Sequence, residues 1–202
     1  SGGENEFDYD VKETLNLASM CSKANVRRFI FISSAKVNGE FALNDNCFTE
    51  DSLPNPCDQY AISKYKTEVG LFKIAQNTNM EIVIIRPPLL YGIGVKGYFK
   101  TILKLVKNKI PLPFAALVKN KRSFIYLDNF LNFLNVVISH PKAANNIFLV
   151  SDQYDISSAY LLSNLYIGMH DRDYLFKFPN YLLSTSSKII GKSRLYNKLK
   201  ES

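Results

Sequence analysis

The chain has 202 residues, of which 47% are hydrophobic and 21% charged, and its formal net charge is +7. This composition fits one sizeable globular unit and excludes a low-complexity chain. No apolar run approaches the length of a membrane span, about 18 residues, and the lysines are dispersed without a nucleic-acid reader motif. Neither a membrane nor a nucleic acid is therefore an expected partner. The excess of positive charge suits an anionic ligand such as a nucleotide diphosphate.

The cysteines and histidines give no sign of a metal site. Cys21, Cys47 and Cys57 form no C-x-x-C pair, and His140 and His170 add no zinc-ligand spacing. No metal is therefore expected. Reduced thiols are the default, and they favour a cytoplasmic protein.

The first predicted element is an amphipathic helix over about residues 9–24, with one apolar face drawn from Val11, Leu15, Ala18 and Met20. The apolar run RFIFIS at 28–33 predicts a buried parallel strand whose carboxyl end opens on a site. After a polar loop, Asp58 is the expected N-cap of a long helix that runs to about Asn77.

The next predicted strand is EIVIIR at 81–86, which the two prolines at 87–88 stop. A helix is expected near 98–107, followed by a short strand at 123–127.

The remaining chain continues the alternation of helices and strands. Asp128 is the expected cap of a helix that ends near Ser139, and NIFLV at 146–150 predicts a strand. A further helix should begin with Ser157 or Ser158 as its cap. A last helix is expected at 181–190, with Gly191 as its C-cap. Strands that alternate with helices predict an α/β fold with a Rossmann-like, mainly parallel sheet.

The stretch YGIGVKGYF at 91–99 contains Gly92, Gly94 and Gly97 in the spacing G-x-G-x-x-G. A dinucleotide-binding loop needs its first glycine at the end of a strand, so that the turn is tight. Here the preceding strand ends near Arg86 and two prolines intervene. We therefore predict a flexible turn rather than a cofactor loop.

The strongest chemical motif is Y-A-I-S-K, in which Tyr60 and Lys64 are four residues apart. This spacing puts both side chains on one face of a helix. A phenol has an ordinary pKa near 10, and a neighbouring ammonium favours the phenolate, which makes the phenol a usable acid–base group. The pair alone is also compatible with an ordinary exposed helix face, but Ser33 and Ser34 at a strand end strengthen the functional interpretation.

The ordered motifs FIFISSAKVNGE, FTEDSLPNPCDQYAISK, VIIRPPLLYGIG, RSFIYLDN and NIFLVSD carry a family resemblance. Together they resemble the extended short-chain dehydrogenase/reductases, and within them the NAD-dependent epimerase/dehydratase group that acts on nucleotide sugars. The resemblance covers about residues 9–191. It implies an enzyme that uses NAD or NADP and binds a nucleotide sugar, here a UDP-sugar.

The resemblance also implies roles for residues at matching positions. Ser34, Tyr60 and Lys64 would be catalytic, with Tyr60 as acid/base, Lys64 lowering its pKa and Ser34 bonding the reacting sugar oxygen. Cofactor contacts would come from Ser33, Tyr60, Lys64 and Pro87.

Substrate contacts implied by the resemblance are Ser34, Lys36, Leu112, Phe114 and Arg122. The planar guanidinium of Arg122 suits a diphosphate. An ordinary surface arginine remains the alternative. For Leu112 and Phe114 the alternative to a uracil pocket is an apolar loop packed on the core.

Two departures bear on the reaction. Ala35-Lys36 replaces the Asp-Glu pair of 4,6-dehydratases, which disfavours dehydration. The segment Val37-Asn38-Gly39 replaces the V-Y-G of many relatives and leaves the sugar open. The resemblance therefore implies a nucleotide-sugar 4-epimerase, with a 4-keto-reductase as the main alternative. A non-catalytic Rossmann-like module and a steroid-type dehydrogenase are further alternatives.

The resemblance also predicts the organisation of the chain. Residues 1–88 would be the C-terminal part of an NAD(P)-binding domain, and 89–202 a substrate-binding lobe from which 124–151 returns to the Rossmann sheet. No strand and glycine-rich turn precede the first helix, so we expect a fragment that binds NAD weakly by itself. A homodimer through the helices near 9–24 and 58–77 is expected.

Overall fold

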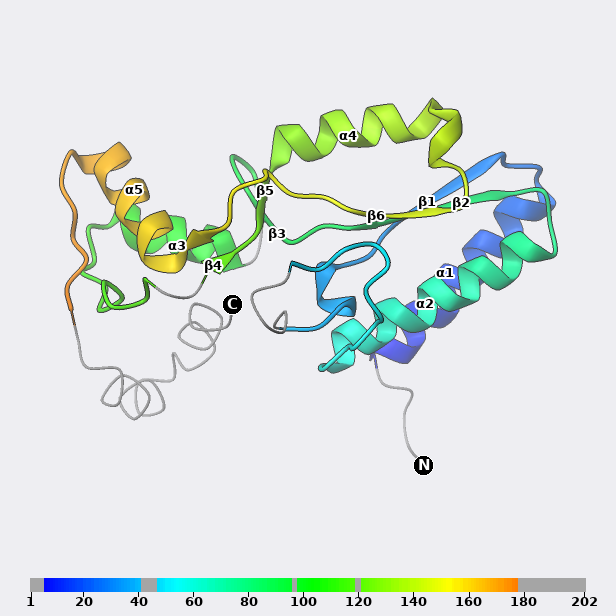
Figure 1. Cartoon of the computed structure of the whole chain (residues 1–202), viewed down its shortest axis with the longest axis horizontal. Coiled ribbons are helices and arrows are strands. Elements are labelled where there is room, and N and C mark those ends of the chain that lie inside the picture. The colour runs from blue at the N-terminus through cyan, green and yellow to red at the C-terminus, as the bar shows by residue number, and fades with distance from the viewer. Residues whose placement is uncertain (1–5, 41–46, 96–97, 119–120, 178–202) are drawn as a thin grey trace. The chain divides into compact units, whose positions relative to one another are not determined.

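The structure is a computed structural model, and it describes residues 6–40, 47–95, 98–118 and 121–177 (Figure 1). The chain divides into two compact units. The first unit is Ser1–Pro88 with Asp128–Ser151, and the second is Leu89–Leu127 with Asp152–Ser202. The ligand that each unit binds stays a prediction. The helix expected at 181–190, with its cap Gly191, lies outside the described residues.

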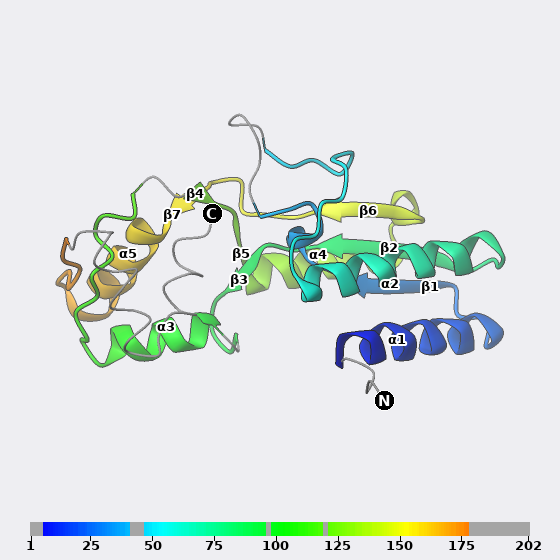
Figure 2. The same ribbon diagram turned by 90° about the horizontal axis from the view of Figure 1, so that it is seen from below.

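The first unit contains a parallel three-stranded sheet in the order β1-β2-β6 (Figure 2). Its strands are β1 (Arg28–Ile32), β2 (Glu81–Arg86) and β6 (Asn146–Leu149). In the register, Ile30 lies opposite Val83 and Ile84 opposite Ile147. All three strands had been predicted from apolar runs, and the α/β fold class with a parallel sheet is confirmed.

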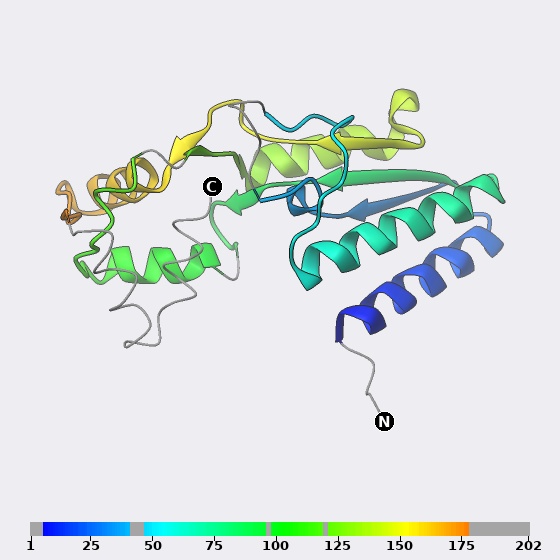
Figure 3. The ribbon, with the colours of Figure 1, turned by 60° about the horizontal axis from the view of Figure 1, so that its bottom comes forward.

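Helices cover both faces of this sheet (Figure 3). On one face lie α1 (Glu6–Lys23) and α2 (Gln59–Gln76), and on the other lies α4 (Leu127–Ser139). A buried cluster joins α1, α2 and β2, and its members are Ala18, Leu71, Met80, Ile82 and Ile84. Met20 had been predicted on the apolar face of α1. This prediction is wrong, because Met20 is 67% exposed, whereas Ala18 is fully buried.

Three N-caps were predicted for helices that the structure describes, and two of these predictions are confirmed. Asp58 caps α2, and its Oδ1 accepts a hydrogen bond from the Ala61 amide at 2.7 Å. Ser157 caps α5 (Ser158–His170). Asp128 was predicted as a cap but lies inside the first turn of α4, since that helix begins at Leu127. A carboxylate is favourable there because it faces the positive end of the helix dipole.

Among its described residues, the second unit contains α3 (Tyr98–Lys107), α5 and four very short strands. The strands form a parallel pair, β3 (Leu89–Tyr91) with β5 (Phe124–Tyr126), and an antiparallel pair, β4 (Lys121–Arg122) with β7 (Ile156–Ser157). The sequence predicted β5 but not the other three. Within the described residues, no helix of the chain has the length and apolar character needed to cross a membrane.

The glycine-containing stretch at 91–99 follows β3, so it does not join a strand of the three-stranded sheet to a helix. Gly92 has a φ of +132°, and a Cβ there would lie 2.9 Å from the Tyr126 ring. Gly94 has a φ of +84°. Both glycines are therefore explained by backbone conformation, and at Gly92 also by a close neighbour. Gly97 lies outside the described residues.

Candidate active site

The parallel strands β1 and β2 end at the same edge of the sheet, and the chain beyond β1 stays tied to that edge. The Ser33 amide donates to the Ile85 carbonyl at 2.7 Å, and the Ala35 amide donates to the Pro87 carbonyl at 3.0 Å. Ser34 is held between these two bonds. The edge where strand carboxyl ends meet is the place where open α/β sheets bind their ligands.

Ser34 begins the short helix η1 (Ala35–Val37) and also contacts Tyr60. Its Oγ accepts a hydrogen bond from the Lys36 amide at 3.3 Å. The same hydroxyl lies close enough to the Tyr60 phenol to lower its pKa as a hydrogen-bonding neighbour. Tyr60 is 41% exposed, so a ligand can reach it. The structure therefore brings together two of the three residues predicted to be catalytic.

Lys64 lies one helical turn beyond Tyr60 on α2 and faces the end of β1. Its Nζ donates to the Ile32 carbonyl at 3.1 Å. The same atom lies 4.7 Å from the centre of the Phe31 ring and 5.7 Å from the centre of the Tyr60 ring. All three predicted catalytic side chains therefore gather at the end of β1.

The environment of Tyr60 raises the pKa of its phenol. Burial is the largest cause, the hydrogen bond from Ser34 lowers the pKa, the Asp58 carboxylate raises it, and the Lys36 ammonium lowers it. Lys36 is thus a cation that favours the phenolate, a role that the sequence analysis gave to Lys64. Burial lowers the pKa of Lys64 itself, against the raising effect of nearby carboxylates.

Lys36 is held by carboxylates on both sides. Its Nζ donates to Asp58 Oδ2 at 2.8 Å and lies 3.8 Å from Glu40 Oε1. Because the other oxygen of Asp58 caps α2 at Ala61, one carboxylate ties η1 to the start of the helix that carries Tyr60. The predicted contact of Lys36 with substrate stays a prediction.

A buried polar network lies directly behind these residues. Arg86 donates through Nε to Glu68 Oε1 at 3.0 Å, through Nη2 to Glu68 Oε2 at 2.5 Å, and through Nη1 to Asn38 Oδ1 at 3.1 Å. The Ser33 hydroxyl donates to the same Glu68. These four residues, which we call the Glu68 network, are each at most 3% exposed. The structure gives the Ser33 hydroxyl this internal partner, and the predicted contact of Ser33 with the cofactor stays a prediction.

Sequence reasoning missed Glu68 and Arg86, and it treated Asn38 only as a departure from a family motif. The available signals were weak. Glu68 continues the four-residue spacing of Tyr60 and Lys64, and Arg86 is a charge at the end of an otherwise apolar strand. Asn38 now has a structural explanation, since it accepts a hydrogen bond from Arg86.

The remaining predicted substrate residues belong to the second unit. Arg122 lies in β4, opposite Ile156 of β7, and is partly exposed. Leu112 and Phe114 are 6% and 5% exposed and belong to the apolar core of that unit. This burial favours the alternative in which both residues pack on the core.

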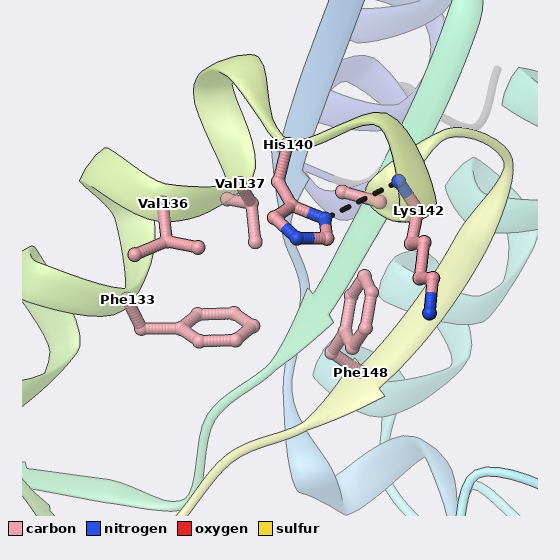
Figure 4. A pocket seen from close by; sticks show the side chains of 7 residues that line it. Phe133, Val136, Val137, His140, Lys142 and Phe148 are labelled. Carbon is pink, nitrogen blue, oxygen red and sulfur yellow. Dashed lines mark hydrogen bonds between the residues drawn. The ribbon is translucent and has the colours of Figure 1, made fainter.

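A shallow apolar hollow of about 170 Å³ lies between α4 and β6 (Figure 4). Phe133, Val136 and Phe148 line it, and His140 at its rim accepts a hydrogen bond from the Lys142 amide at 3.2 Å. Apart from His140 and Lys142, its lining is apolar.

The edge beside Tyr60 and Lys64 can hold one part of a dinucleotide. A phenol and an ammonium at the ends of parallel strands suit the hydroxyl groups of a nicotinamide ribose. A pyrophosphate normally needs a glycine-rich turn between a strand and a helix. Among the described residues of the first unit, no strand leads into a turn of that kind. The residues present fit the nicotinamide riboside part of NAD.

Known proteins support this interpretation. The profile of the "NAD dependent epimerase/dehydratase family" matches residues 3–151. A UDP-glucose 4-epimerase of Vibrio cholerae is 40% identical over 186 residues, which cover 92% of this chain and 57% of that protein. The chain thus spans little more than half the length of this relative.

Solved structures show the same fold at low sequence identity. UDP-N-acetylglucosamine 4-epimerase from Bacillus cereus matches with a TM-score of 0.74 at 14% identity, covering 99% of this chain and 77% of that one. UDP-glucuronic acid 4-epimerase from Bacillus cereus in complex with NAD matches with a TM-score of 0.70 at 18% identity, covering 100% and 68%. With the profile match and the Vibrio relative, these findings lead to one conclusion: the chain belongs to the NAD-dependent epimerase/dehydratase family of enzymes.

Proposed function

We propose that the full-length protein carrying this chain is a nucleotide-sugar 4-epimerase that acts on a UDP-sugar. The observation that carries the proposal is the gathering of Ser34, Tyr60 and Lys64 at the end of β1, with Lys64 Nζ bonded to the Ile32 carbonyl and 5.7 Å from the centre of the Tyr60 ring. The name of the Vibrio cholerae relative supports the choice of reaction and of nucleotide.

Tyr60 would act as the acid/base for the hydroxyl at carbon 4 of the sugar. Its phenolate oxygen takes the proton of that hydroxyl as the carbon becomes a ketone, and returns the proton when the alcohol re-forms on the opposite face. The Ser34 hydroxyl would share this oxygen and hold the sugar at bonding distance from Tyr60. Lys36 would favour the phenolate that this cycle needs, because its charge lowers the pKa of Tyr60.

NAD, when bound, supplies the acceptor and donor of the hydride at carbon 4. We assign its nicotinamide ribose to Tyr60 and Lys64, which share one face of α2. Pro87 would support the nicotinamide from the strand end; it is buried and its carbonyl already accepts a bond from Ala35. This assignment involves only residues of the first unit.

Arg122 would bind the diphosphate of the substrate. A guanidinium can bond two phosphate oxygens at once, which a lysine does less well. Since Leu112 and Phe114 are buried in the core of the second unit, we assign them to the support of this segment rather than to direct contact.

A 4-keto-reductase would use the same Ser34, Tyr60 and Lys64, so the two reactions must be separated by experiment. The full-length protein is incubated with UDP-glucose and NAD, and the product is separated by chromatography. We expect UDP-galactose without net formation of NADH. If the protein instead oxidises NADPH in the presence of a 4-keto sugar nucleotide and forms no epimer, the reductase is favoured.

The homodimer and the cytoplasmic location complete the proposal. The outer face of α1 exposes Tyr9, Leu17 and Met20, which are at least 54% exposed, and α2 exposes Val69 at 39%. These apolar side chains suit a contact between the helix pairs of two subunits. Sedimentation of the full-length protein measures this association.

A further inference from the structure

One face of α2 holds the end of β1 at three successive turns. Tyr60 faces the Ser34 hydroxyl, Lys64 donates to the Ile32 carbonyl, and Glu68 accepts from the Ser33 hydroxyl. Residues spaced by four lie above one another on a helix, and the residues they hold, 32–34, are consecutive on the chain. Tyr60 can therefore meet Ser34 only while this alignment of α2 with β1 is kept.

The third of these contacts is the most firmly fixed. Arg86 at the end of β2 binds both oxygens of Glu68, which is the bidentate geometry that gives a carboxylate one orientation. Both side chains are 2% exposed. The Lys64 contact, by comparison, is a single bond from a flexible side chain to a carbonyl.

A second arm of the network reaches the loop after η1. Asn38 accepts from Arg86 and donates to the Ser52 carbonyl at 3.3 Å and the Thr49 carbonyl at 3.5 Å. This loop leads to Asp58, the residue that caps α2. Arg86 is thus connected to the Tyr60 helix at Glu68, and through Asn38 to the segment just before that helix begins.

Stability alone does not explain such a network. Burying an ion pair carries a large desolvation penalty, and well-packed apolar residues often replace both partners with no loss of stability. What apolar residues cannot supply is the fixed orientation of a bidentate pair. The value of the network would then lie in where it holds α2.

We infer that Glu68, held by Arg86, is a positioning residue that sets the alignment of α2 with the end of β1 and so brings Tyr60 onto Ser34. The inference rests on the proposed function, because it assigns the network to the same acid–base pair.

The chain offers a matched control at the opposite ends of the same two strands. Arg28 of β1 lies opposite Glu81 of β2, and their side chains pair at 2.7 Å. The Arg28 side chain is 5% exposed. This pair has similar chemistry but lies away from Tyr60.

The test compares two double variants of the full-length protein, Glu68→Met/Arg86→Met and Arg28→Met/Glu81→Met. We expect both to stay folded by circular dichroism. The first should lose about 100-fold in kcat, with KM within about 3-fold, because a misplaced catalytic group costs about that much. The second should keep its kcat within about 3-fold. A Glu68→Met/Arg86→Met variant that is folded and retains the parent kcat would overturn the inference.

If that double variant does not fold, Glu68→Gln replaces it. Gln keeps the volume and an acceptor for Ser33 but lacks the second carboxylate oxygen that Arg86 binds. We expect about a 10-fold loss of kcat for Glu68→Gln. An unchanged kcat in the folded Glu68→Gln variant would contradict the inference.

A second readout does not depend on turnover. The phenol of Tyr60 is titrated by ultraviolet absorbance, as the difference between each background and its Tyr60→Phe derivative. Ser34, Lys36, Asp58 and Lys64 face this phenol, and both its burial and its contact with Ser34 depend on the alignment of α2. The phenol pKa should therefore shift in Glu68→Met/Arg86→Met and stay unchanged in Arg28→Met/Glu81→Met.

An unchanged phenol pKa in the folded Glu68 variant, whether Met/Met or Gln, would also overturn the inference. The two claims can fail separately: a parent protein that converts no nucleotide sugar contradicts the proposed function, whereas the titration still tests the positioning role.

Discussion

The two ends of the three-stranded sheet carry an Arg–Glu pair each, and the pairs have different surroundings. At the amino end, Arg28 binds Glu81 on the neighbouring strand and also donates to the Val137 carbonyl near the end of α4. At the carboxyl end, Arg86 binds Glu68 on α2 and Asn38 beyond η1. The first pair joins β1 and β2 to the end of α4. The second pair fixes α2, the helix that carries Tyr60.

This difference shows how the same ion pair can serve two purposes. The amino-end pair is partly exposed at Glu81, whose side chain is 30% exposed, so water screens it. Both members of the carboxyl-end pair are buried, and the partly exposed Tyr60 lies two helical turns from Glu68 on the same face. A rigid interior behind an accessible phenol is the arrangement that a catalytic group needs.

The largest effect should come from Tyr60→Phe, which removes the acid–base hydroxyl and little else. We expect turnover of UDP-glucose by the full-length protein to fall by about 1,000-fold, because a general acid–base group contributes about 100- to 10,000-fold. The loss is measured as the initial rate of product formation. Bound cofactor, measured by its absorbance after denaturation, should be unchanged. Near-parent turnover would remove Tyr60 from this role.

The next effect contrasts the two glutamates. Glu68→Ala leaves a buried guanidinium without its charge partner and should cost about 3–5 kcal/mol in the free energy of unfolding. Glu81→Ala removes a partly exposed partner, where water can reach the guanidinium of Arg28, and should cost less than Glu68→Ala. Urea denaturation followed by circular dichroism measures both. Equal costs would mean that the two ends of the sheet do not differ in the way described.

Two adjacent serines give a sharper and smaller contrast. Ser34→Ala removes the hydroxyl that faces Tyr60 and should lower kcat by about 100-fold, while loss of its bond from the Lys36 amide should cost at most about 1 kcal/mol in stability. Ser33→Ala leaves a Glu68 oxygen with one partner fewer and should cost about 1–2 kcal/mol in stability. Rates and melting curves are recorded for both variants. If Ser33→Ala lowered kcat and Ser34→Ala mainly lowered stability, the roles of the two residues would have to be exchanged.

The smallest effects come from two charged residues near Tyr60, and their removal should shift the pKa of Tyr60 in opposite directions. Lys36→Met removes a cation that favours the phenolate, so the pKa of Tyr60 rises and activity should appear at higher pH. Asp58→Asn removes a carboxylate that disfavours the phenolate while keeping an oxygen to cap α2, so the pKa falls and the profile should move to lower pH. The pH dependence of kcat/KM measures both. Shifts in the same direction would contradict this account.

Much of the first unit was predictable because its elements have strong local patterns. The runs at 28–33, 81–86 and 146–150 are apolar without interruption, which is typical of strands buried on both faces. The strands β3, β4 and β7 have two or three residues each, too few to show any period. Their positions depend on pairing between segments far apart in the sequence.

The site was predictable to the extent that it is local. Tyr60 and Lys64 share a helix face, so spacing alone places them together. The pairing of Glu68 with Arg86 is not local, and whether a charge is buried cannot be read from composition. Which of the two serine hydroxyls turns toward Glu68 depends on the twist of the chain beyond β1. Similarly, Lys36 acts on Tyr60 only because Asp58 brings η1 beside α2.

The most direct test of the central claim follows the hydrogen at carbon 4. The full-length protein is given UDP-glucose labelled with deuterium at that carbon, together with NAD, and the product is analysed by mass spectrometry. A 4-epimerase returns the hydride to the same carbon, so the UDP-galactose formed should keep the deuterium. A Tyr60→Phe variant should form almost none of this product. Loss of the label from the product, or no epimer at all from the parent protein, would contradict the proposed function.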